Sequence, residues 1–297
     1  MSLKTRLFCL LLTTLLTCES NAELIRYTTW NLQWLANQPH KKLISPNRSE
    51  NDIRLIREYF IKTSSDVMAF QEVNDIDIIS KIVGPNYKII LSHRSRIENQ
   101  ANQFDKINQY TGFAVKSSLE VLDHIDLKLD KRPTSRLRFA SYIELVKPSK
   151  LSVHLLSVHL KGGCRTKYQN KRSCVILKEQ LTNINLWIRE REKHHQTYIV
   201  LGDFNSQMAD KAEWAWRLVS HKTKAILASQ DTDAKCSVKS NKMRTGLFKY
   251  NNIIDHIIVD SSQAFTSAKQ VSFNNKDVRQ YKLSDHCPII IDTFDSS

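Results

Sequence analysis

The sequence predicts one α+β domain that is rich in antiparallel sheet. Short apolar and β-branched runs recur along the chain, which is typical of buried strands. Two longer stretches instead repeat apolar residues at helical spacing. No internal repeat, low-complexity tract or Pro/Gly/Ser-rich linker divides the 297 residues, so we expect a short leader followed by a single domain.

Residues 1–22 have the pattern of a secretory signal peptide. A basic start precedes the apolar run Leu7–Leu16, and small residues follow up to Ala22. The run is too short to span a bilayer as an anchor. We therefore expect residues 23–297 to be an exported domain, periplasmic or secreted. A lipoprotein signal ending at Cys18 is the alternative, although the threonine before it is larger than the residue usually accepted there.

Cysteine usage agrees with export. The chain has six cysteines, two of which lie in the predicted leader. An even set of four in an exported chain indicates two disulfides, and these cysteines lack the close paired spacing of a zinc site. Three pairings are open. We favour Cys164–Cys174, which closes a short basic loop and leaves Cys236–Cys287.

The predicted elements follow one another in a mixed order. The first predicted helix begins after the polar, acidic segment Ser49–Asp52. The second is predicted from the apolar stripe that runs from Leu177 to Ile188. The predicted strands are short apolar runs around these helices: residues 25–29, 67–70, 88–91, 111–115, 138–145, 151–158, 198–201, 253–259 and 289–291.

Polar side chains follow these strands with unusual regularity. After a single strand, an acid is most often a turn former or a helix cap. Here acids, amides and imidazoles recur at six strand ends, which is typical of catalytic groups gathered on the loops of a rigid scaffold. His256 is not counted as a candidate, because neighbouring residues of a strand point to opposite faces and His256 therefore faces away from the side of Asp255. The residues concerned are Asn31, Glu72, His159, Lys161, Asp203, Asn205, Asp255, Asp285 and His286.

The segments that contain these residues resemble a known set of motifs. In chain order, TTWNLQWL, AFQEV, SVHLKGG, LGDFNS, IIDHIIV and LSDHCPI are similar to the serial motifs of the endonuclease/exonuclease/phosphatase superfamily. These metal-dependent phosphoesterases include pancreatic-type deoxyribonuclease. The resemblance spans about residues 25–294. It implies a four-layer α/β sandwich, with two mainly antiparallel sheets packed face to face, flanking helices and an active site at one rim.

The resemblance also implies a metal site. Glu72 is expected to be the main ligand, with Asn31 and Asp285 beside it. Carboxylate and amide oxygens suit hard divalent ions. The expected ion is therefore Mg²⁺ or Mn²⁺, with Ca²⁺ as an alternative.

The catalytic roles follow from the same resemblance. Asp203 would orient and deprotonate the attacking water, and Asn205 would hold that water or the phosphate. His286 would stabilise charge on the phosphoryl group or act as an acid–base, with Asp255 fixing its tautomer. His159 matches a second histidine of the deoxyribonuclease and sphingomyelinase branches, which the abasic-site repair branch lacks.

Substrate contacts are less firmly indicated. Tyr110 and Arg132 lie where relatives carry phosphate-contacting groups, but a core role for Tyr110 and a substrate role for Arg136 instead are both open. Lys161 is either part of the site or a solvated lysine. The remaining candidates are basic residues of two clusters, residues 161–178 and 235–249: Arg165, Lys167, Lys171, Arg172, Lys178, Lys242 and Arg244, with Tyr168 able to stack on a base.

The net charge favours a polyanionic substrate. Lys and Arg number 44 against 30 Asp and Glu, which gives +14. We therefore expect a monomeric, nonspecific nuclease that hydrolyses DNA, with RNA as a second candidate substrate, through a water activated by Asp203. A lipid phosphoesterase is the second hypothesis, although no long apolar hairpin suited to membrane insertion is evident. A noncatalytic binding or toxin subunit on the same fold is the third.

Overall fold

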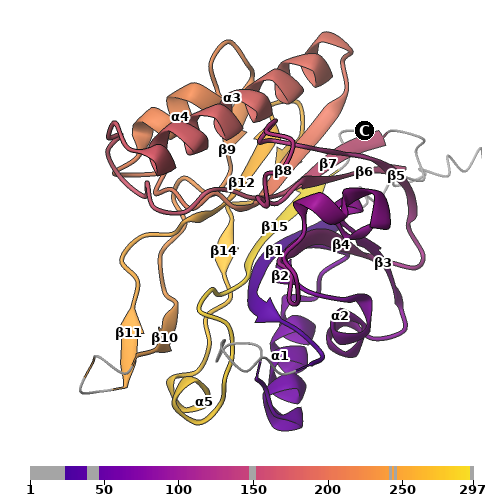
Figure 1. Cartoon of the computed structure of the whole chain (residues 1–297), viewed down its shortest axis with the longest axis vertical. Coiled ribbons are helices and arrows are strands. Elements are labelled where there is room, and N and C mark those ends of the chain that lie inside the picture. The colour runs from indigo at the N-terminus through magenta and orange to yellow at the C-terminus, as the bar shows by residue number, and fades with distance from the viewer. Residues whose placement is uncertain (1–23, 39–46, 147–151, 241–242, 244–245, 295–297) are drawn as a thin grey trace, which may run out of the picture.

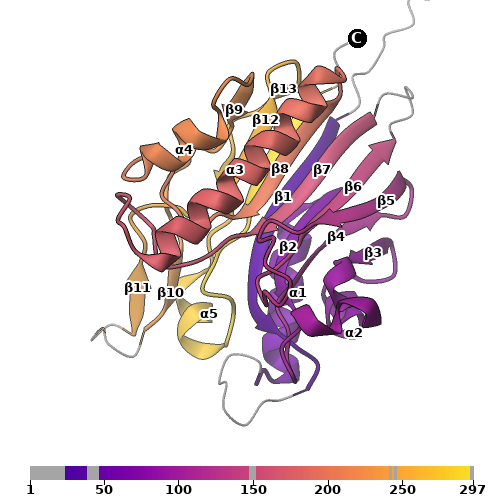
Figure 2. The same ribbon diagram turned by 45° about the horizontal axis from the view of Figure 1, so that its top comes forward.

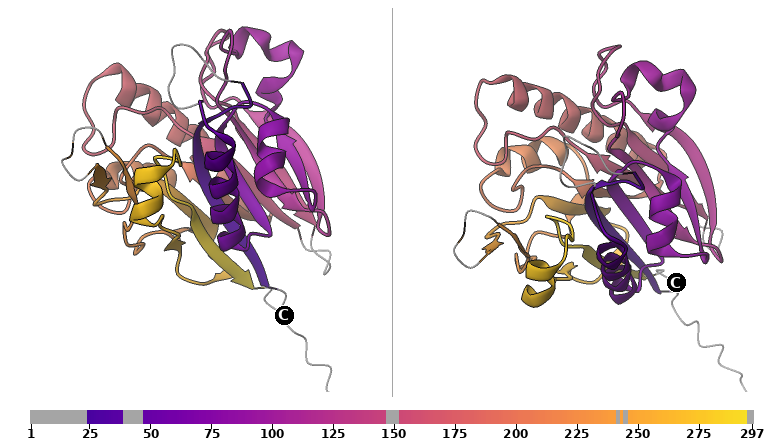
Figure 3. Two further views of the ribbon diagram at one scale, coloured as in Figure 1. Left: turned by 90° about the horizontal axis from the view of Figure 1, so that it is seen from below. Right: turned by 60° about the horizontal axis from the view of Figure 1, so that its bottom comes forward.

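The computed structural model describes residues 24–38, 47–146, 152–240, 243 and 246–294. Two β-sheets pack face to face between two layers of helices, as the three views of the ribbon show (Figures 1, 2 and 3). The predicted four-layer α/β sandwich is therefore confirmed. The predicted signal peptide lies outside the described residues.

The first sheet runs in the order β13-β15-β1-β2-β4-β3, with β14 also paired to β15. Only β1 and β2 run parallel among these pairs; the others are antiparallel. Its strands are β1 (Leu24–Leu35), β2 (Val67–Val73), β3 (Tyr87–Leu91), β4 (Tyr110–Lys116), β13 (Ala264–Phe265), β14 (Lys269–Gln270) and β15 (Ile289–Phe294).

The second sheet runs in the order β5-β6-β7-β8-β12-β9. Here β7 and β8 are the parallel pair. Its strands are β5 (Glu120–Leu127), β6 (Ala140–Val146), β7 (Ser152–His159), β8 (Thr197–Asp203), β9 (Ala225–Leu227) and β12 (Asp255–Asp260). A separate two-stranded hairpin, β10 (Ser237–Lys239) and β11 (Leu247–Lys249), extends from one end of the molecule (Figure 1).

The helices cover the outer faces of the sheets (Figures 1 and 3). Ser49 caps the first helix in a capping box with Asp52, as its polar start predicts. The helices are α1 (Glu50–Thr63), α2 (Ile76–Val83), α3 (Arg172–Lys193), α4 (Glu213–Val219) and α5 (Asn275–Gln280), with 3₁₀ turns at His93–Ser95 and Ile97–Asn102.

Three apolar clusters hold these layers together. Strand residues of both sheets, such as Phe113 and Leu155, fill the space between the sheets. The second cluster joins the first sheet to α1 and α2, and the third joins the second sheet to α3 and α4. The stripe from Leu177 to Ile188 faces inward from α3, as its spacing predicts. The sandwich is rigid where its strands end, and that rigidity positions the polar residues.

Two disulfides close loops near those strand ends. Cys164 bonds to Cys174, and Cys236 bonds to Cys287, which is the pairing that the sequence favours. Bonds of this kind fit an oxidising compartment. Among the described residues, no helix combines the length and the apolar character that a membrane span requires.

Candidate active site

The parallel pairing of β7 and β8 places two predicted residues side by side. His159 is the register partner of Asp203, and Asp203 is in turn the partner of Asp255 on β12. Gly202 allows this pairing, because a Cβ atom there would lie 2.0 Å from the carbonyl oxygen of Val158. The glycine that interrupts the apolar run therefore lets β8 approach β7 where the catalytic candidates lie.

The other sheet contributes Asn31 and Glu72 from its own parallel pair, β1 and β2. Glu72 has a φ of 60°, and Asn205 across the site has a φ of 52°. A non-glycine residue in this left-handed region costs about 1–2 kcal/mol, so the surrounding contacts must hold it there. One such contact is the backbone N–H of Trp34, which donates to Glu72 Oε2 at 3.0 Å.

Two loops of the site are tied together through the backbone. Trp30 donates from Nε1 to the carbonyl oxygen of His286 at 2.9 Å, and Ser284 donates from Oγ to that of Asn31 at 2.5 Å. Arg48 adds bonds from Nη2 to the carbonyls of Leu32, Gln33 and Leu283. The first and last motifs of the chain thus form one unit.

Asp203 lies at the centre of the hydrogen-bond network. Its Oδ2 accepts from Asn31 Nδ2 at 3.0 Å and from Asn205 Nδ2 at 3.1 Å. Its Oδ1 accepts from the backbone N–H of Asn205 at 2.7 Å. Burial raises the pKa of Asp203 to about 7, opposed by His286 and reinforced by the charges of Asp255 and Glu72. A carboxyl group with such a pKa is suited to proton transfer near neutral pH.

His286 forms an acid–imidazole pair with Asp255. Its Nδ1 lies 2.7 Å from Asp255 Oδ2, while its Nε2 lies 4.0 Å from Asp203 Oδ2 and 3.9 Å from Asp285 Oδ1. Burial alone would lower the pKa of His286, but the three aspartates raise it well above its ordinary value. The aspartates therefore favour the charged form of His286, whose Nε2 is directed toward the space beside Asp203.

His159 closes the opposite side of the same space. Its Nε2 lies 3.5 Å from both Glu72 Oε1 and Asp203 Oδ2. Burial lowers its pKa well below the ordinary value, helped by the charges of Arg138, His286 and Arg94. The site thus holds one neutral and one charged imidazole, which can perform different tasks.

The donor set fits a hard divalent cation. Glu72 and Asp203 direct carboxylate oxygens at the same two nitrogens, those of Asn31 and His159. Asp255 Oδ1 is buried and has no hydrogen-bond partner. Buried carboxylates that converge on one space favour a bound Mg²⁺ or Mn²⁺. Glu72 Oε1 faces this space, whereas Asn31 turns its Nδ2 toward Glu72 and Asp203 and accepts at Oδ1 from the backbone N–H of Gln33 at 2.9 Å. Asp285 is more exposed and contacts only the edge of the group.

The site also includes two arginines that the sequence did not predict. Arg138 is half-buried, donates from Nη2 to the carbonyl of Leu160 at 2.9 Å and has an unpaired, buried Nε. Arg94 is fully buried, and its guanidinium lies 5.4 Å from the ring of Tyr110. Burial lowers the pKa of Arg94 to about 10, yet it stays charged at neutral pH. Neither lies in a recognisable motif, so the sequence offered no signal for them.

The predicted substrate contacts lie around the rim. Arg132 is ion-paired with Asp130 and lines a groove with Phe104, Arg136, Lys161 and Arg172. Tyr110 is buried at 6% exposure, so its ring packs within the protein.

A second pocket includes His286 in its lining. Arg165 and Tyr250 line it, together with Asp255, Asp285 and His286. Lys167 is exposed on the loop between Cys164 and Cys174. Lys242 and Arg244 lie outside the described residues. Cations thus line both pockets, Arg165 in the one that includes His286 and Arg132, Arg136, Lys161 and Arg172 in the other.

Comparison with known proteins relates this architecture to solved structures. No protein-family model and no curated protein matches the sequence. TDP2 from C. elegans superposes with a TM-score of 0.63 at 17% identity, covering 92% of this chain and 75% of that one. An endonuclease/exonuclease/phosphatase from Bacteroides vulgatus gives 0.64 at 15% identity, covering 91% and 98%. The Bacteroides thetaiotaomicron mannosyl-6-phosphatase Bt3783 gives 0.60 at 13% identity, covering 91% and 99%. The chain therefore has the fold of the endonuclease/exonuclease/phosphatase proteins, as its six motifs predicted.

Proposed function

We propose that this chain is a member of that superfamily and an exported, divalent-metal-dependent phosphodiesterase that acts as a monomeric, nonspecific nuclease on DNA, with RNA as the second candidate nucleic acid. The observation that supports this most directly is the meeting of Asp203, the Asp255–His286 pair, His159 and Glu72 at one rim of the sandwich. Five motifs that are far apart in sequence supply this single group of side chains.

The residues divide the work of hydrolysis. Asp203, held by Asn31 and Asn205, accepts the proton of the attacking water, and its raised pKa suits that task. The charged His286 faces the same space and stabilises negative charge that develops on the phosphoryl oxygens. His159 is neutral, so its ring binds the phosphate through one N–H.

A bound Mg²⁺ or Mn²⁺ would supply charge neutralisation at the phosphoryl oxygens and the leaving oxygen. Glu72 and Asn31 would hold it, with Asp285 as a third ligand and water in the remaining positions. Ca²⁺ is the less favoured ion, because it takes six to eight oxygen ligands.

Cations around the rim favour a long polyanion over a small substrate. Arg136, Lys161 and Arg172 line one pocket, and Arg165 lines another together with Asp255 and His286. Lysine and arginine placed along a groove neutralise successive phosphates without reading the sequence. This arrangement supports a nonspecific nuclease.

A phosphomonoesterase is the second candidate, favoured by the structural likeness to a protein named mannosyl-6-phosphatase. The same catalytic group serves either ester, so the substrate assay decides between them. A lipid phosphoesterase and a noncatalytic subunit are outcomes of the same assay.

The test uses purified residues 23–297 and an Asp203→Ala variant with supercoiled plasmid, a sugar 6-phosphate and sphingomyelin vesicles. Each is assayed with Mg²⁺ and with chelator. Nicking that requires both the metal and Asp203 is the expected result. Release of inorganic phosphate from the sugar without nicking, or turnover of vesicles alone, would replace the nuclease. No turnover of any substrate by the folded, metal-loaded protein would favour the noncatalytic subunit.

A further inference from the structure

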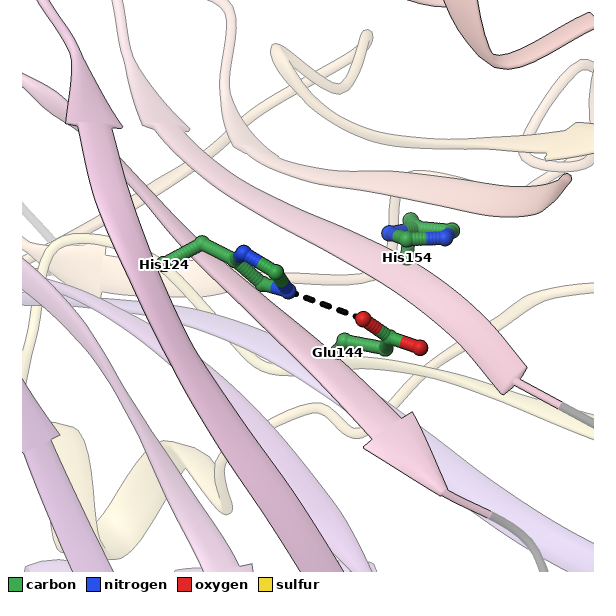
Figure 4. Close-up of side chains that lie close together, drawn as sticks. All are labelled: His124, Glu144 and His154. Atoms are coloured by element: carbon green, nitrogen blue, oxygen red, sulfur yellow. Dashed lines mark hydrogen bonds and ion pairs between the residues drawn. The ribbon is translucent and has the colours of Figure 1, made fainter. Parts of the chain in front are cut away.

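A second group of metal-binding side chains lies away from the active site. His124, Glu144 and His154 project from the adjacent strands β5, β6 and β7 (Figure 4). Each offers one ligand atom, and these atoms all lie within 4.8 Å of one another. His154 precedes His159 on β7 by five residues, which is roughly 16 Å along an extended strand. The group is therefore distinct from the catalytic one.

Strand pairing explains why the three side chains meet. Glu144 is the register partner of His154, and His124 is the partner of Tyr142, two residues from Glu144 on the same face of β6. His124 Nε2 lies 2.9 Å from Glu144 Oε2. The register of β5 against β6 shifts directly after His124, and such an irregularity redirects side chains locally.

Tyr142 fixes the orientation of both imidazoles. Its ring stacks on His124 with a centroid distance of 4.5 Å, and its hydroxyl lies 2.6 Å from His154 Nδ1. Arg191 donates to the same hydroxyl oxygen at 2.5 Å. If Nδ1–H of His154 donates to that oxygen, Nε2 presents a lone pair to the group. Metal-bound histidines usually make such a bond through their second nitrogen.

From this geometry we propose that His124, Glu144 and His154 form a Zn²⁺ site with its fourth position open to water. Two imidazoles and one carboxylate in tetrahedral array are a common zinc donor set. Ligand atoms of one tetrahedral zinc ion lie about 3.3 Å apart, so small side-chain movements complete the site. His124 and Glu144 have side-chain exposures of 35% and 18%, which leaves a path for the ion and a water.

The site would fasten the edge of the second sheet. β5 is an outermost strand of that sheet and pairs only with β6 among the described strands. A metal bound by β5, β6 and β7 crosslinks it to the interior and stabilises the folded state by mass action. The guanidinium of Arg191 nearby opposes a cation, so we expect weaker binding than at a closed zinc site with four protein ligands.

The test is Zn²⁺ titration of the chelator-treated full chain, followed by calorimetry and thermal melting. His124→Asn and Glu144→Gln each remove one ligand without opening the core. The wild type is expected to bind one equivalent of Zn²⁺ more than either variant. His194→Asn is the matched control, because His194 and Glu190 form a pair at 2.8 Å that has no third donor in the described part of the chain.

The active site can also bind Zn²⁺, so the zinc equivalent bound there must be distinguished from the one bound by His124, Glu144 and His154. Asp203→Asn is expected to weaken that equivalent and to retain the one assigned to His124, Glu144 and His154. Co²⁺ in place of Zn²⁺ should give the visible absorption of a tetrahedral ion in the wild type and in Asp203→Asn, but not in Glu144→Gln. If His124→Asn and Glu144→Gln bind the same equivalents as the wild type, or if no ion binds outside the active site, the proposal is wrong.

Discussion

At the scale of single residues, Asp203 combines its proposed catalytic role with a cost to stability. Its pKa of about 7, raised from 3.8 by burial, means that the folded protein retains a proton that the unfolded chain has lost. Between these two pKa values the folded state binds more protons, so its stability falls as the pH rises. The metal-free protein should therefore lose stability across that window.

Asp203→Asn separates the two roles. We expect turnover to fall by roughly 10²–10⁴-fold, because the proton acceptor is lost. The metal-free variant should lose less stability than the wild type between pH 4.5 and 6.5, since asparagine does not ionise. Thermal melts in chelator at both pH values and plasmid nicking in Mg²⁺ measure these effects. Asp231→Asn, at an exposed acid, should change neither, and an active Asp203→Asn enzyme would contradict the role.

The Asp255–His286 pair predicts a shift in the pH profile. Asp255 helps to raise the pKa of His286, so the imidazole stays charged to a higher pH than an ordinary histidine. If the charged form is required, activity declines as the pH rises through that raised pKa. Asp255→Asn should move this alkaline limb to lower pH.

The measurement is kcat/KM against pH for the wild type, Asp255→Asn and the exposed-acid control Asp233→Asn. An alkaline limb that stays in place or moves to higher pH in Asp255→Asn would show that His286 does not act as the cation. Asp233 is paired with Lys235 at 3.4 Å, so its substitution removes a carboxylate without touching the site.

The residues of the candidate site could be identified from the sequence only where they lie in a motif. Asn31, Glu72, His159 and Asp203 lie in the last part of their strands and Asp255 begins β12, so the recurrence of polar residues at strand termini and the order of the motifs suggested a common site. Arg94 and Arg138 could not be found this way, because arginines are frequent in this chain and only tertiary packing buries these two.

At the scale of elements, Gly202 sets the geometry of β8. A methyl group there would meet the carbonyl of Val158 at 2.0 Å, and neither backbone can yield without disturbing the pairing of His159 with Asp203. We expect Gly202→Ala to destabilise the protein by about 1–3 kcal/mol or more and to reduce turnover. Urea unfolding and plasmid nicking measure both effects.

Gly246→Ala is the matched control. Its φ is +71°, but a Cβ there meets no atom within 4 Å. It should cost only about 1–2 kcal/mol of backbone strain and leave turnover unchanged. Equal effects of the two substitutions on turnover would remove the link between Gly202 and the active site.

Elements with clear apolar patterns were predicted, and those with mixed exposure were not. The strands around Val67 and Tyr198 are almost wholly buried, so their runs are continuous. β5 was missed because it is an edge strand with mostly partly or fully exposed side chains. The two β-strands of the β10–β11 hairpin have only three residues each, too few for a periodic signal.

At the scale of the whole molecule, the order of the motifs predicted the four layers, which periodicity alone did not. Strand runs are compatible with many sheet arrangements, and the pairing of β1 with β15 joins opposite ends of the chain. Such long-range pairing is invisible to local patterns. The metal site at His124, Glu144 and His154 is a further example, since its three ligands lie outside every motif.

The net charge of +14 leads to the last prediction, because it concerns how the whole surface meets a polyanion. Binding that neutralises phosphates releases counterions, so the affinity for DNA should fall steeply as salt rises, by about 0.9 logarithmic units per tenfold salt for each phosphate contacted. KM for plasmid should rise accordingly, while hydrolysis of a small phosphodiester should change little. Arg165→Ala and Arg172→Ala, which alter two different pockets, should each lower the salt slope by about one contact. Lys62→Ala is the control and should leave the salt slope unchanged, because Lys62 lies in the last turn of α1, at the opposite end of that helix from Arg48. A slope near zero for plasmid, with small diesters still hydrolysed, would mean that the basic surface does not bind substrate and that the nuclease assignment must give way to a small phosphoester.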